Sequence, residues 1–256
     1  MIDDNSKEFI KRHIGPSYVE QSKMLQHVGY SSLEDLMKNT VPEKILLKDD
    51  LNIDEPLSEN DALKKLKSIS KKNKIFRNFI GMGYYNSITP NVILRNILEN
   101  PGWYTSYTPY QPEVAQGRLE MLLNFQQSII DLTGMDIANA SLLDEATATA
   151  EAVGLSQRLD KTNSKKIFIS NNCNPQTIDL IKTRTNPFGL ELIIGDEKKE
   201  LTKISDDIIC GVLSYPGTLG EINDPSESIS LIHKKNGKAI LVCDLLALAR
   251  LKTPAE

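Results

Sequence analysis

Aromatic side chains with polar tips are concentrated in one stretch of this chain, between residues 84 and 110, where its only tryptophan also lies. They suit a rigid pocket wall, because the rings supply contact area and the hydroxyls supply hydrogen bonds that orient a ligand. A subunit interface would use the same rings equally well, and their spacing leaves both interpretations open. The candidate binding residues are Tyr84, Tyr85, Tyr104, Ser106, Tyr107, Thr108 and Tyr110.

A second candidate is the loop around Asp144 and Glu145, which joins a predicted strand to a predicted helix. In open parallel sheets, ligands bind at the carboxyl ends of the strands, beside helix N-termini. A phosphate site there requires Gly, Ser or Thr with free backbone N–H groups. Two carboxylates stand at the helix start instead, and their charges would repel a phosphate. We therefore interpret the loop as structural, with Asp144 as the N-cap of the helix.

Asp244 is the third candidate, because it directly follows the predicted strand 239–243. A carboxylate in that position can hydrogen-bond a buried protonated ring nitrogen, as a pyridoxal phosphate site requires. Capping of the next turn explains the same residue equally well.

Two glycine-containing stretches carry no clear ligand signal. Gly81-Met82-Gly83 lacks the third glycine of a dinucleotide fingerprint, and no clear strand precedes it. The stretch 214–220 is typical of a tight connection after a strand rather than of an oxyanion loop.

Composition excludes several classes of partner. The net charge is −4 and the basic residues form no stripe, which argues against nucleic acid or an anionic membrane as the main partner. No apolar run approaches the roughly 20 residues that span a bilayer, and no signal or transit pattern opens the chain. Cys173, Cys210 and Cys243 lie far apart, so we expect structural thiols, no metal site and a cytoplasmic location.

Strands and helices are predicted to alternate through the second half of the chain. Such alternation predicts an α/β fold with a mostly parallel sheet and helices on both faces. A long helix should open at Pro112 and end at Gly134, and an earlier one should run from Thr89-Pro90 to Pro101-Gly102. The expected strands are 137–143, 167–170, 190–195, 208–214 and 239–243, and the expected helices between them are 145–159, 175–185 and 225–235.

The chain divides into a predicted helical segment, 1–75, and a predicted large domain, 76–256. Cap signals at Ser17, Ser32 and Ser58 indicate helices in the first part. The last predicted strand lacks the crossover that normally follows a parallel strand, so we expect a fragment of a longer polypeptide. A complete short protein with a ragged tail is the alternative.

Several stretches together resemble the glycine cleavage system P-protein family, over essentially the whole chain. Phe9–Pro16 resembles the opening segment of the family's proteins. Asp244–Leu248 resembles a run late in their N-terminal half. The composite motifs that carry it are Gly81–Tyr85, Trp103–Glu113, Gln116–Glu120 and Ala138–Glu145.

The resemblance implies an incomplete large domain of the aminotransferase-like fold type I, from the N-terminal half or first subunit of the enzyme. It also implies a role in decarboxylating glycine dehydrogenase, which uses pyridoxal phosphate to decarboxylate glycine and passes the aminomethyl group to the lipoyl arm of H-protein. The expected partners are the catalytic half or second subunit, lipoylated H-protein and glycine. Pyridoxal phosphate is expected on the other half, not covalently on this chain.

The resemblance also assigns roles to the candidate residues. No catalytic residue is expected in this chain, and Lys252 follows Asp244 too closely to serve as the cofactor lysine. The tyrosines and their hydroxyl neighbours would complete the active site of the partner half. The positions expected to form a degenerate cofactor site are Asp144, Glu145, Thr147, Asn171 and Asp244.

Two alternatives remain open at this point. The chain could be a non-catalytic half that stabilises and regulates the catalytic half and docks H-protein. Another fold-type-I enzyme, such as an aminotransferase, would predict a Ser/Thr/Gly phosphate loop in place of Asp144 and Glu145.

Overall fold

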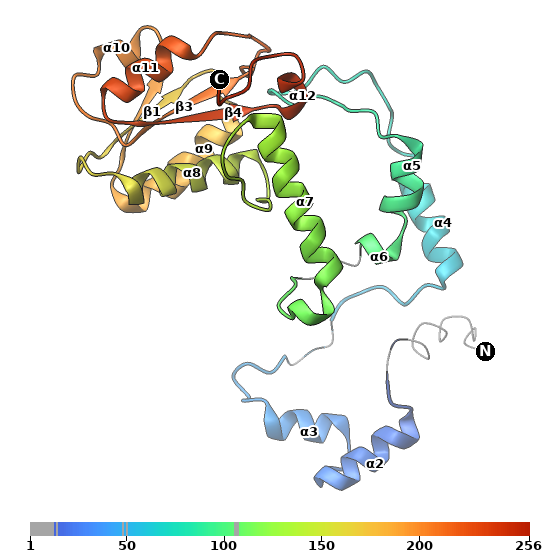
Figure 1. Cartoon of the computed structure of the whole chain (residues 1–256). Coiled ribbons are helices and arrows are strands. Elements are labelled where there is room, and N and C mark those ends of the chain that lie inside the picture. The colour runs from blue at the N-terminus through green and yellow to red at the C-terminus, as the bar shows by residue number, and fades with distance from the viewer. Residues whose placement is uncertain (1–12, 14, 48, 50, 105–107) are drawn as a thin grey trace. The chain divides into compact units, whose positions relative to one another are not determined.

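The computed structural model describes residues 13, 15–47, 49, 51–104 and 108–256 (Figure 1). Its contacts divide the chain into two units, Met1–Arg77 and Asn78–Glu256. The division lies two residues beyond the predicted boundary, and each unit is described by itself.

Serine caps set the helix starts in the first unit. Ser17, Ser32 and Ser58 each accept a hydrogen bond from a backbone N–H of the first turn, which satisfies a donor that has no partner within the helix. Gly29 ends the first helix with a φ of +85°. Leu25 is the one buried residue among the three helices, so they bury little apolar surface within the described chain. The helices are α2 (Tyr18–Val28), α3 (Leu33–Thr40) and α4 (Glu59–Ser70).

The second unit begins with helices and continues with alternating strands and helices. Its opening helical elements are α5 (Asn91–Ile93), a π-helical turn (Leu94–Leu98), α6 (Pro101–Tyr104), a 3₁₀ turn (Pro112–Val114) and α7 (Gln116–Thr133). The alternating part comprises α8 (Glu145–Leu159), β1 (Lys166–Ser170), α9 (Pro175–Thr185), a 3₁₀ turn (Asn186–Phe188), β2 (Glu191–Gly195), α10 (Glu200–Lys203), β3 (Cys210–Tyr215), α11 (Ser226–Lys234), β4 (Lys238–Cys243) and α12 (Leu245–Leu248).

The four strands form one parallel sheet in the order β2-β1-β3-β4. Ile169 on the central strand β1 stands opposite Ile194 on β2 and Val212 on β3. Helices join the strands, as parallel pairing requires. The predicted mostly parallel α/β sheet is therefore confirmed.

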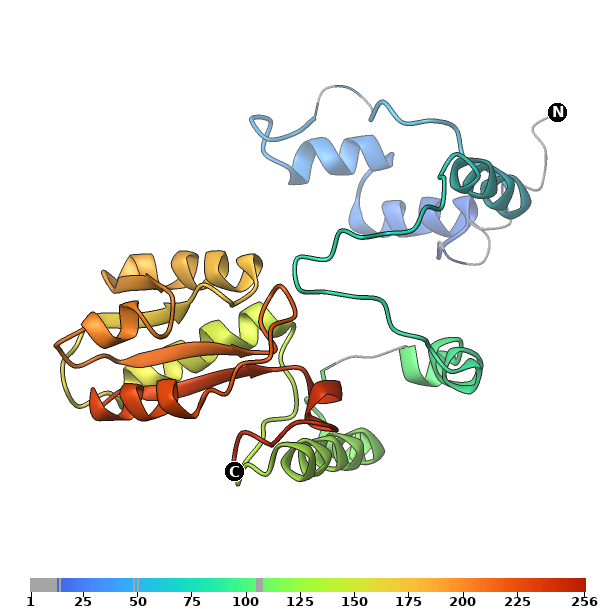
Figure 2. The same cartoon turned by 90° about the horizontal axis from the view of Figure 1, so that it is seen from above.

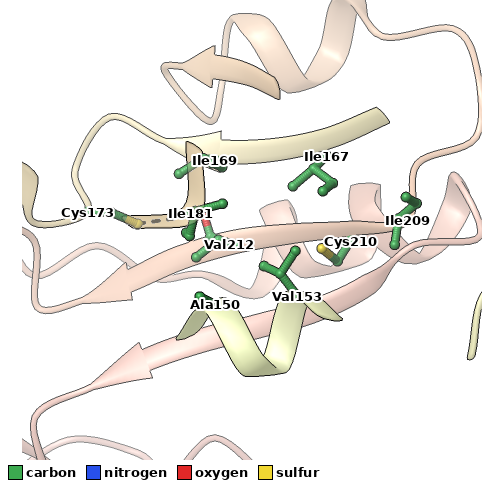
Figure 3. Packing of buried hydrophobic residues seen from close by; sticks show 9 residues of the cluster. All are labelled: Ala150, Val153, Ile167, Ile169, Cys173, Ile181, Ile209, Cys210 and Val212. Carbon is green, nitrogen blue, oxygen red and sulfur yellow. Dashed lines mark hydrogen bonds between the residues drawn. The ribbon is translucent and has the colours of Figure 1, made fainter. Parts of the chain in front are cut away.

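Helices cover both faces of the sheet, with α8 and α9 on one face and α10 and α11 on the other (Figures 1 and 2). The alternation of β1 explains the two layers, because successive side chains of a strand point to opposite faces. Ile167 and Ile169 pack in one cluster with Val153 of α8 and Ile181 of α9 (Figure 3). Phe168 lies between them in sequence and packs in the other cluster, whose other members include Leu201 and Ile232.

The predicted strand at 137–143 is wrong. The described segment is irregular and unpaired, with Ile137 84% exposed and Leu143 87% exposed. A strand needs a neighbour for its backbone groups. The segment is held instead by Gln126 of α7, whose side-chain amide donates to the carbonyl oxygen of Ala138 at 2.6 Å. The apolar run 137–143 was therefore a misleading sign of a buried strand.

The helices before the sheet differ from the prediction at both ends of the first helix and at the start of the second, where Pro112 opens a 3₁₀ turn and α7 begins only at Gln116. Pro90 lies at the N-cap position of α5 rather than inside the helix, and Pro101 opens α6 instead of ending a helix, because proline fits a first helical turn. Gly134 closes α7 with a φ of +69°, as predicted. Within the described ranges, no helix has the length and apolar character needed to cross a bilayer.

Replacement of Ile169 with alanine tests the position of the core. Ile169→Ala should lower the free energy of unfolding by about 2–5 kcal/mol, because the change leaves a cavity in a close-packed interior. Ile194→Ala on the neighbouring strand is the matched control, since Ile194 is 39% exposed, and it should cost about 1 kcal/mol or less. Urea unfolding followed by circular dichroism measures both losses, and equal losses would contradict the described core.

Candidate functional site at the carboxyl edge of the sheet

The candidate site includes the N-terminus of α8, which is capped by the side chain of Asp144. The Asp144 carboxylate accepts a hydrogen bond from the backbone N–H of Thr147 at 2.7 Å. This bond lowers the pKa of Asp144, because it stabilises the charged form. The predicted N-cap is thus confirmed, and the Thr147 N–H is engaged by a residue of the chain itself.

Glu145 joins the N-termini of α8 and α9. Its Oε1 accepts hydrogen bonds from Nδ2 of Asn174 at 3.0 Å and from the hydroxyl of Thr177 at 2.8 Å. Both donors are buried, Thr177 completely. Buried polar groups need partners, so Glu145 fixes the spacing of the two helices. Sequence reasoning placed Glu145 at the degenerate cofactor site as a charge that repels phosphate, but it did not identify Asn174 or Thr177 as its partners.

A tight turn places the segment Gly81–Tyr85 at the carboxyl edge of the sheet, the edge at which β1 and β4 end and α9 begins. The Tyr84 N–H donates to the carbonyl oxygen of Gly81 at 2.9 Å, and φ is positive at both central residues, Met82 (50°) and Gly83 (93°). Such a turn favours glycine, which adopts positive φ without a steric penalty. A Cβ added to Gly83 would also lie 1.8 Å from Oδ1 of Asn174. The Gly-Met-Gly motif therefore serves close packing against the start of α9.

Tyr84 lies beside the linked starts of α8 and α9. Partial burial raises the pKa of its hydroxyl, and the negative charges of Glu145 and Asp144 raise it further, while a hydrogen bond with the Asn174 side chain opposes the shift. The ring is 47% exposed, so only part of it is in contact with the edge.

Tyr85 reaches the third carboxylate of the edge. Its hydroxyl donates a hydrogen bond to Oδ2 of Asp244, and this bond raises the pKa of Tyr85. The other oxygen of Asp244, Oδ1, accepts from the backbone N–H of Leu246 at 2.9 Å and caps α12. The capping role is thus present, and the second partner is a phenol of the same chain.

Backbone groups in the remaining loops at this edge form hydrogen bonds with one another. The Asn171 N–H donates to the carbonyl oxygen of Gly195, and the Thr218 N–H donates to that of Asn172. In the loop after β3, the Gly217 N–H and the Leu219 N–H both donate to Glu221, the first to its carbonyl oxygen and the second to its carboxylate. The stretch 214–220 is therefore a tight connection, as its sequence indicated.

The cysteines of this unit are not arranged for metal or redox chemistry. Cys173 and Cys210 are buried, and their burial raises the pKa of each thiol to about 12. Cys243 is half-buried, and its pKa is raised to about 11. The part of the chain that the structure describes holds no group of three His, Cys, Asp or Glu side chains suited to a metal ion.

The other predicted wall residues lie in the segment 104–110, which follows the Gly81–Tyr85 turn in sequence. Tyr104 ends α6, and Tyr110 follows with its N–H donating to the carbonyl oxygen of Thr108 at 2.8 Å. All three side chains are exposed. Ser106 and Tyr107 lie outside the described residues.

The start of α8 does not fit the phosphate of pyridoxal phosphate. A phosphate at the start of α8 needs free N–H groups, whereas Asp144 occupies that of Thr147 and Glu145 adds a second negative charge. A pyridinium nitrogen would have to share the Asp244 carboxylate with the Tyr85 hydroxyl and the Leu246 N–H, each of which donates to one of its oxygens.

Two glutamates of α8 allow a matched test of the link to α9. Glu145→Ala should lower the free energy of unfolding by about 2–4 kcal/mol, because it leaves two buried donors without an ionised acceptor. Glu151→Ala removes an ion pair with Arg184 of α9 that is half exposed, and it should cost about 1 kcal/mol or less. Thermal and urea unfolding compare the two variants, and similar losses would refute the structural role of Glu145.

Comparison with known proteins identifies the family. The family model described as glycine cleavage system P-protein matches residues 11–256. The chain is 72% identical over its full length to the glycine dehydrogenase (decarboxylating) of Pelagibacter ubique, and 52% identical over 97% of its length to that of Nostoc sp.. It covers 27% and 25% of these relatives, so it spans about a quarter of their length.

A solved structure shows the same fold. A crystal structure of glycine decarboxylase (P-protein) of the glycine cleavage system, in inhibitor-bound form, matches 95% of this chain and 55% of its own chain, with 30% identity and a TM-score of 0.83. The predicted fold class, an incomplete aminotransferase-like large domain of fold type I, is confirmed by this likeness. Since the family model also matches nearly every residue, the chain belongs to the glycine cleavage system P-protein family.

Proposed function

We propose that this chain is part of a decarboxylating glycine dehydrogenase. The complete enzyme would use pyridoxal phosphate to decarboxylate glycine and would transfer the aminomethyl group to the lipoyl arm of H-protein. The observation that carries this proposal is the high identity to the Pelagibacter ubique relative over the whole of this chain.

The chain is proposed to belong to the half that does not hold the coenzyme. Its carboxyl edge supports this division, because Asp144, Glu145 and Asp244 already serve other partners. Pyridoxal phosphate, which supplies an electron sink when bound, would be held by the catalytic half or second subunit. Thr147 and Asn171 complete the proposed degenerate site.

The tyrosine-rich stretch is proposed to complete the active site of the catalytic half. Its rings and hydroxyls would hold the glycine carboxylate and shape the entry of the lipoyl arm. Partial exposure of the described rings supports this role, because a wall shared with a neighbour must be open on one side. The proposed wall residues are Tyr84, Tyr85, Tyr104, Ser106, Tyr107, Thr108 and Tyr110.

The proposed setting follows from the same family. Lipoylated H-protein and glycine are the proposed partners and the cytoplasm is the proposed location. We also propose the predicted domains, a helical segment 1–75 and a large domain 76–256.

A non-catalytic role is the second candidate. The half could stabilise its catalytic neighbour and dock H-protein without contacting glycine. The observation that favours it is that Tyr84 and Tyr85 use their polar groups within this chain.

Tyrosine substitutions in the complete enzyme separate the two candidates. Tyr84→Phe combined with Tyr85→Phe should lower glycine turnover roughly 10- to 100-fold, because misplaced wall groups orient the substrate poorly. Release of carbon dioxide from carboxyl-labelled glycine in the presence of lipoylated H-protein measures turnover, and coenzyme absorbance confirms loading. Tyr18→Phe, on exposed α2, is the control. Unchanged turnover in the double variant would favour the non-catalytic role.

Coenzyme titration tests which half carries the cofactor lysine. This chain, mixed with pyridoxal phosphate, should show no specific absorbance band near ~420 nm of the kind that a covalent lysine adduct gives in a tuned site. Lys252→Ala is the matched variant, since Lys252 is the lysine that follows β4. A band that disappears in Lys252→Ala would overturn the proposed division of labour.

A further inference from the structure

Three consecutive residues at the Gly81 turn contact three different elements of the carboxyl edge. Gly83 packs against Asn174 at the start of α9, and Tyr84 lies beside Asn174 and Glu145. Tyr85 reaches Asp244 at the end of β4. A segment that makes all three contacts spans the edge from the start of α8 and α9 to the end of β4.

We propose that the carboxyl edge of this chain is a cradle for its own Tyr84–Tyr85 pair, in which Asp244 is a positioning residue for the Tyr85 hydroxyl. The effect on glycine turnover rests on the proposed function, whereas the cradle itself does not. The interaction is chemically well matched, because a phenol donating to a carboxylate forms a charge-assisted hydrogen bond.

The exposure of Tyr85 indicates positioning rather than core packing. Tyr85 is 70% exposed, so burial of this residue contributes little to stability. Its hydroxyl is nevertheless held by Asp244, whose other oxygen is fixed by the Leu246 N–H. The ring is thus anchored at its polar tip while its faces stay open to a neighbouring half.

The glycine turn fixes the other end of the pair. Gly81 and Gly83 permit a reversal that a side chain would block, since a Cβ on Gly81 would lie 2.4 Å from the carbonyl oxygen of Tyr84. A chain held at the turn and at the Tyr85 hydroxyl has few remaining orientations. Order of this kind lowers the entropy cost of presenting two rings to a ligand.

The cradle can be measured without any activity assay. Fluorotyrosine placed at position 85 of the complete enzyme reports ionisation of that hydroxyl through its ¹⁹F chemical shift. Asp244→Asn should lower the pKa of this group, because it removes the carboxylate whose hydrogen bond with the phenol, and whose negative charge, disfavour the phenolate. Asparagine still caps α12, so the helix start is kept. Asp224→Asn is the matched control, since Oδ1 of Asp224 likewise accepts a hydrogen bond from the backbone N–H two residues ahead, that of Ser226, and it should leave the pKa at position 85 unchanged.

A double-mutant cycle tests the positioning role. Asp244→Asn and Tyr85→Phe should each lower glycine turnover roughly 10-fold, and the double variant should lie within about twofold of Tyr85→Phe alone, because Asp244 acts through Tyr85. Coenzyme content should stay at the wild-type level in all three.

The outcomes distinguish the two proposals. An unchanged ¹⁹F titration in Asp244→Asn overturns the cradle, whatever the turnover. A shifted titration with additive losses, or with no loss, overturns the positioning role while the contact stands. Absence of glycine turnover in the wild-type enzyme refutes the proposed function, and the titration still decides the cradle.

Discussion

The arrangement of the second unit depends on carboxylates of the chain itself, which accept hydrogen bonds from donors at the carboxyl edge of the sheet. Helix N-termini at such an edge expose N–H groups and partial positive charge, which must meet an anion, a polar side chain or water. In a phosphate-binding protein the ligand provides that anion. Here Asp144, Glu145 and Asp244 provide it, each through hydrogen bonds to this chain.

This internal neutralisation links packing to function. Glu145 holds α8 and α9 together through buried donors, and Asp244 closes β4 and starts α12. The same two carboxylates lie beside Tyr84 and Tyr85. In the proposed division of labour, the residues at the degenerate cofactor site would therefore also orient the tyrosine pair. The proposed half without a coenzyme would in this way present a defined surface to its neighbour.

Local features could be predicted from the sequence, and contacts distant in sequence could not. The caps at Ser17, Ser58 and Asp144 depend on residues within one helical turn, and the buried strands depend on short β-branched runs. The run 137–143 was predicted as a strand because apolar content alone cannot show whether a pairing partner exists.

The geometry of the site could be determined only from the structure, because its contacts join residues that are distant in sequence. Glu145 and Thr177 are 32 positions apart on different helices, and Tyr85 and Asp244 are 159 positions apart. No periodicity or spacing rule connects such residues. The family resemblance gave the fold and the expected division between halves, but it did not show that Tyr85 donates to Asp244.

The most direct measurement is a structure of the complete enzyme with coenzyme and glycine bound, at a resolution that defines hydroxyl positions. We expect coenzyme density on the other half alone, the Tyr85 hydroxyl within hydrogen-bonding distance of Asp244, and the Tyr84 and Tyr85 rings facing the neighbouring coenzyme. Phosphate bound at the Thr147 N–H of this half, or both rings buried far from any coenzyme, would contradict the account.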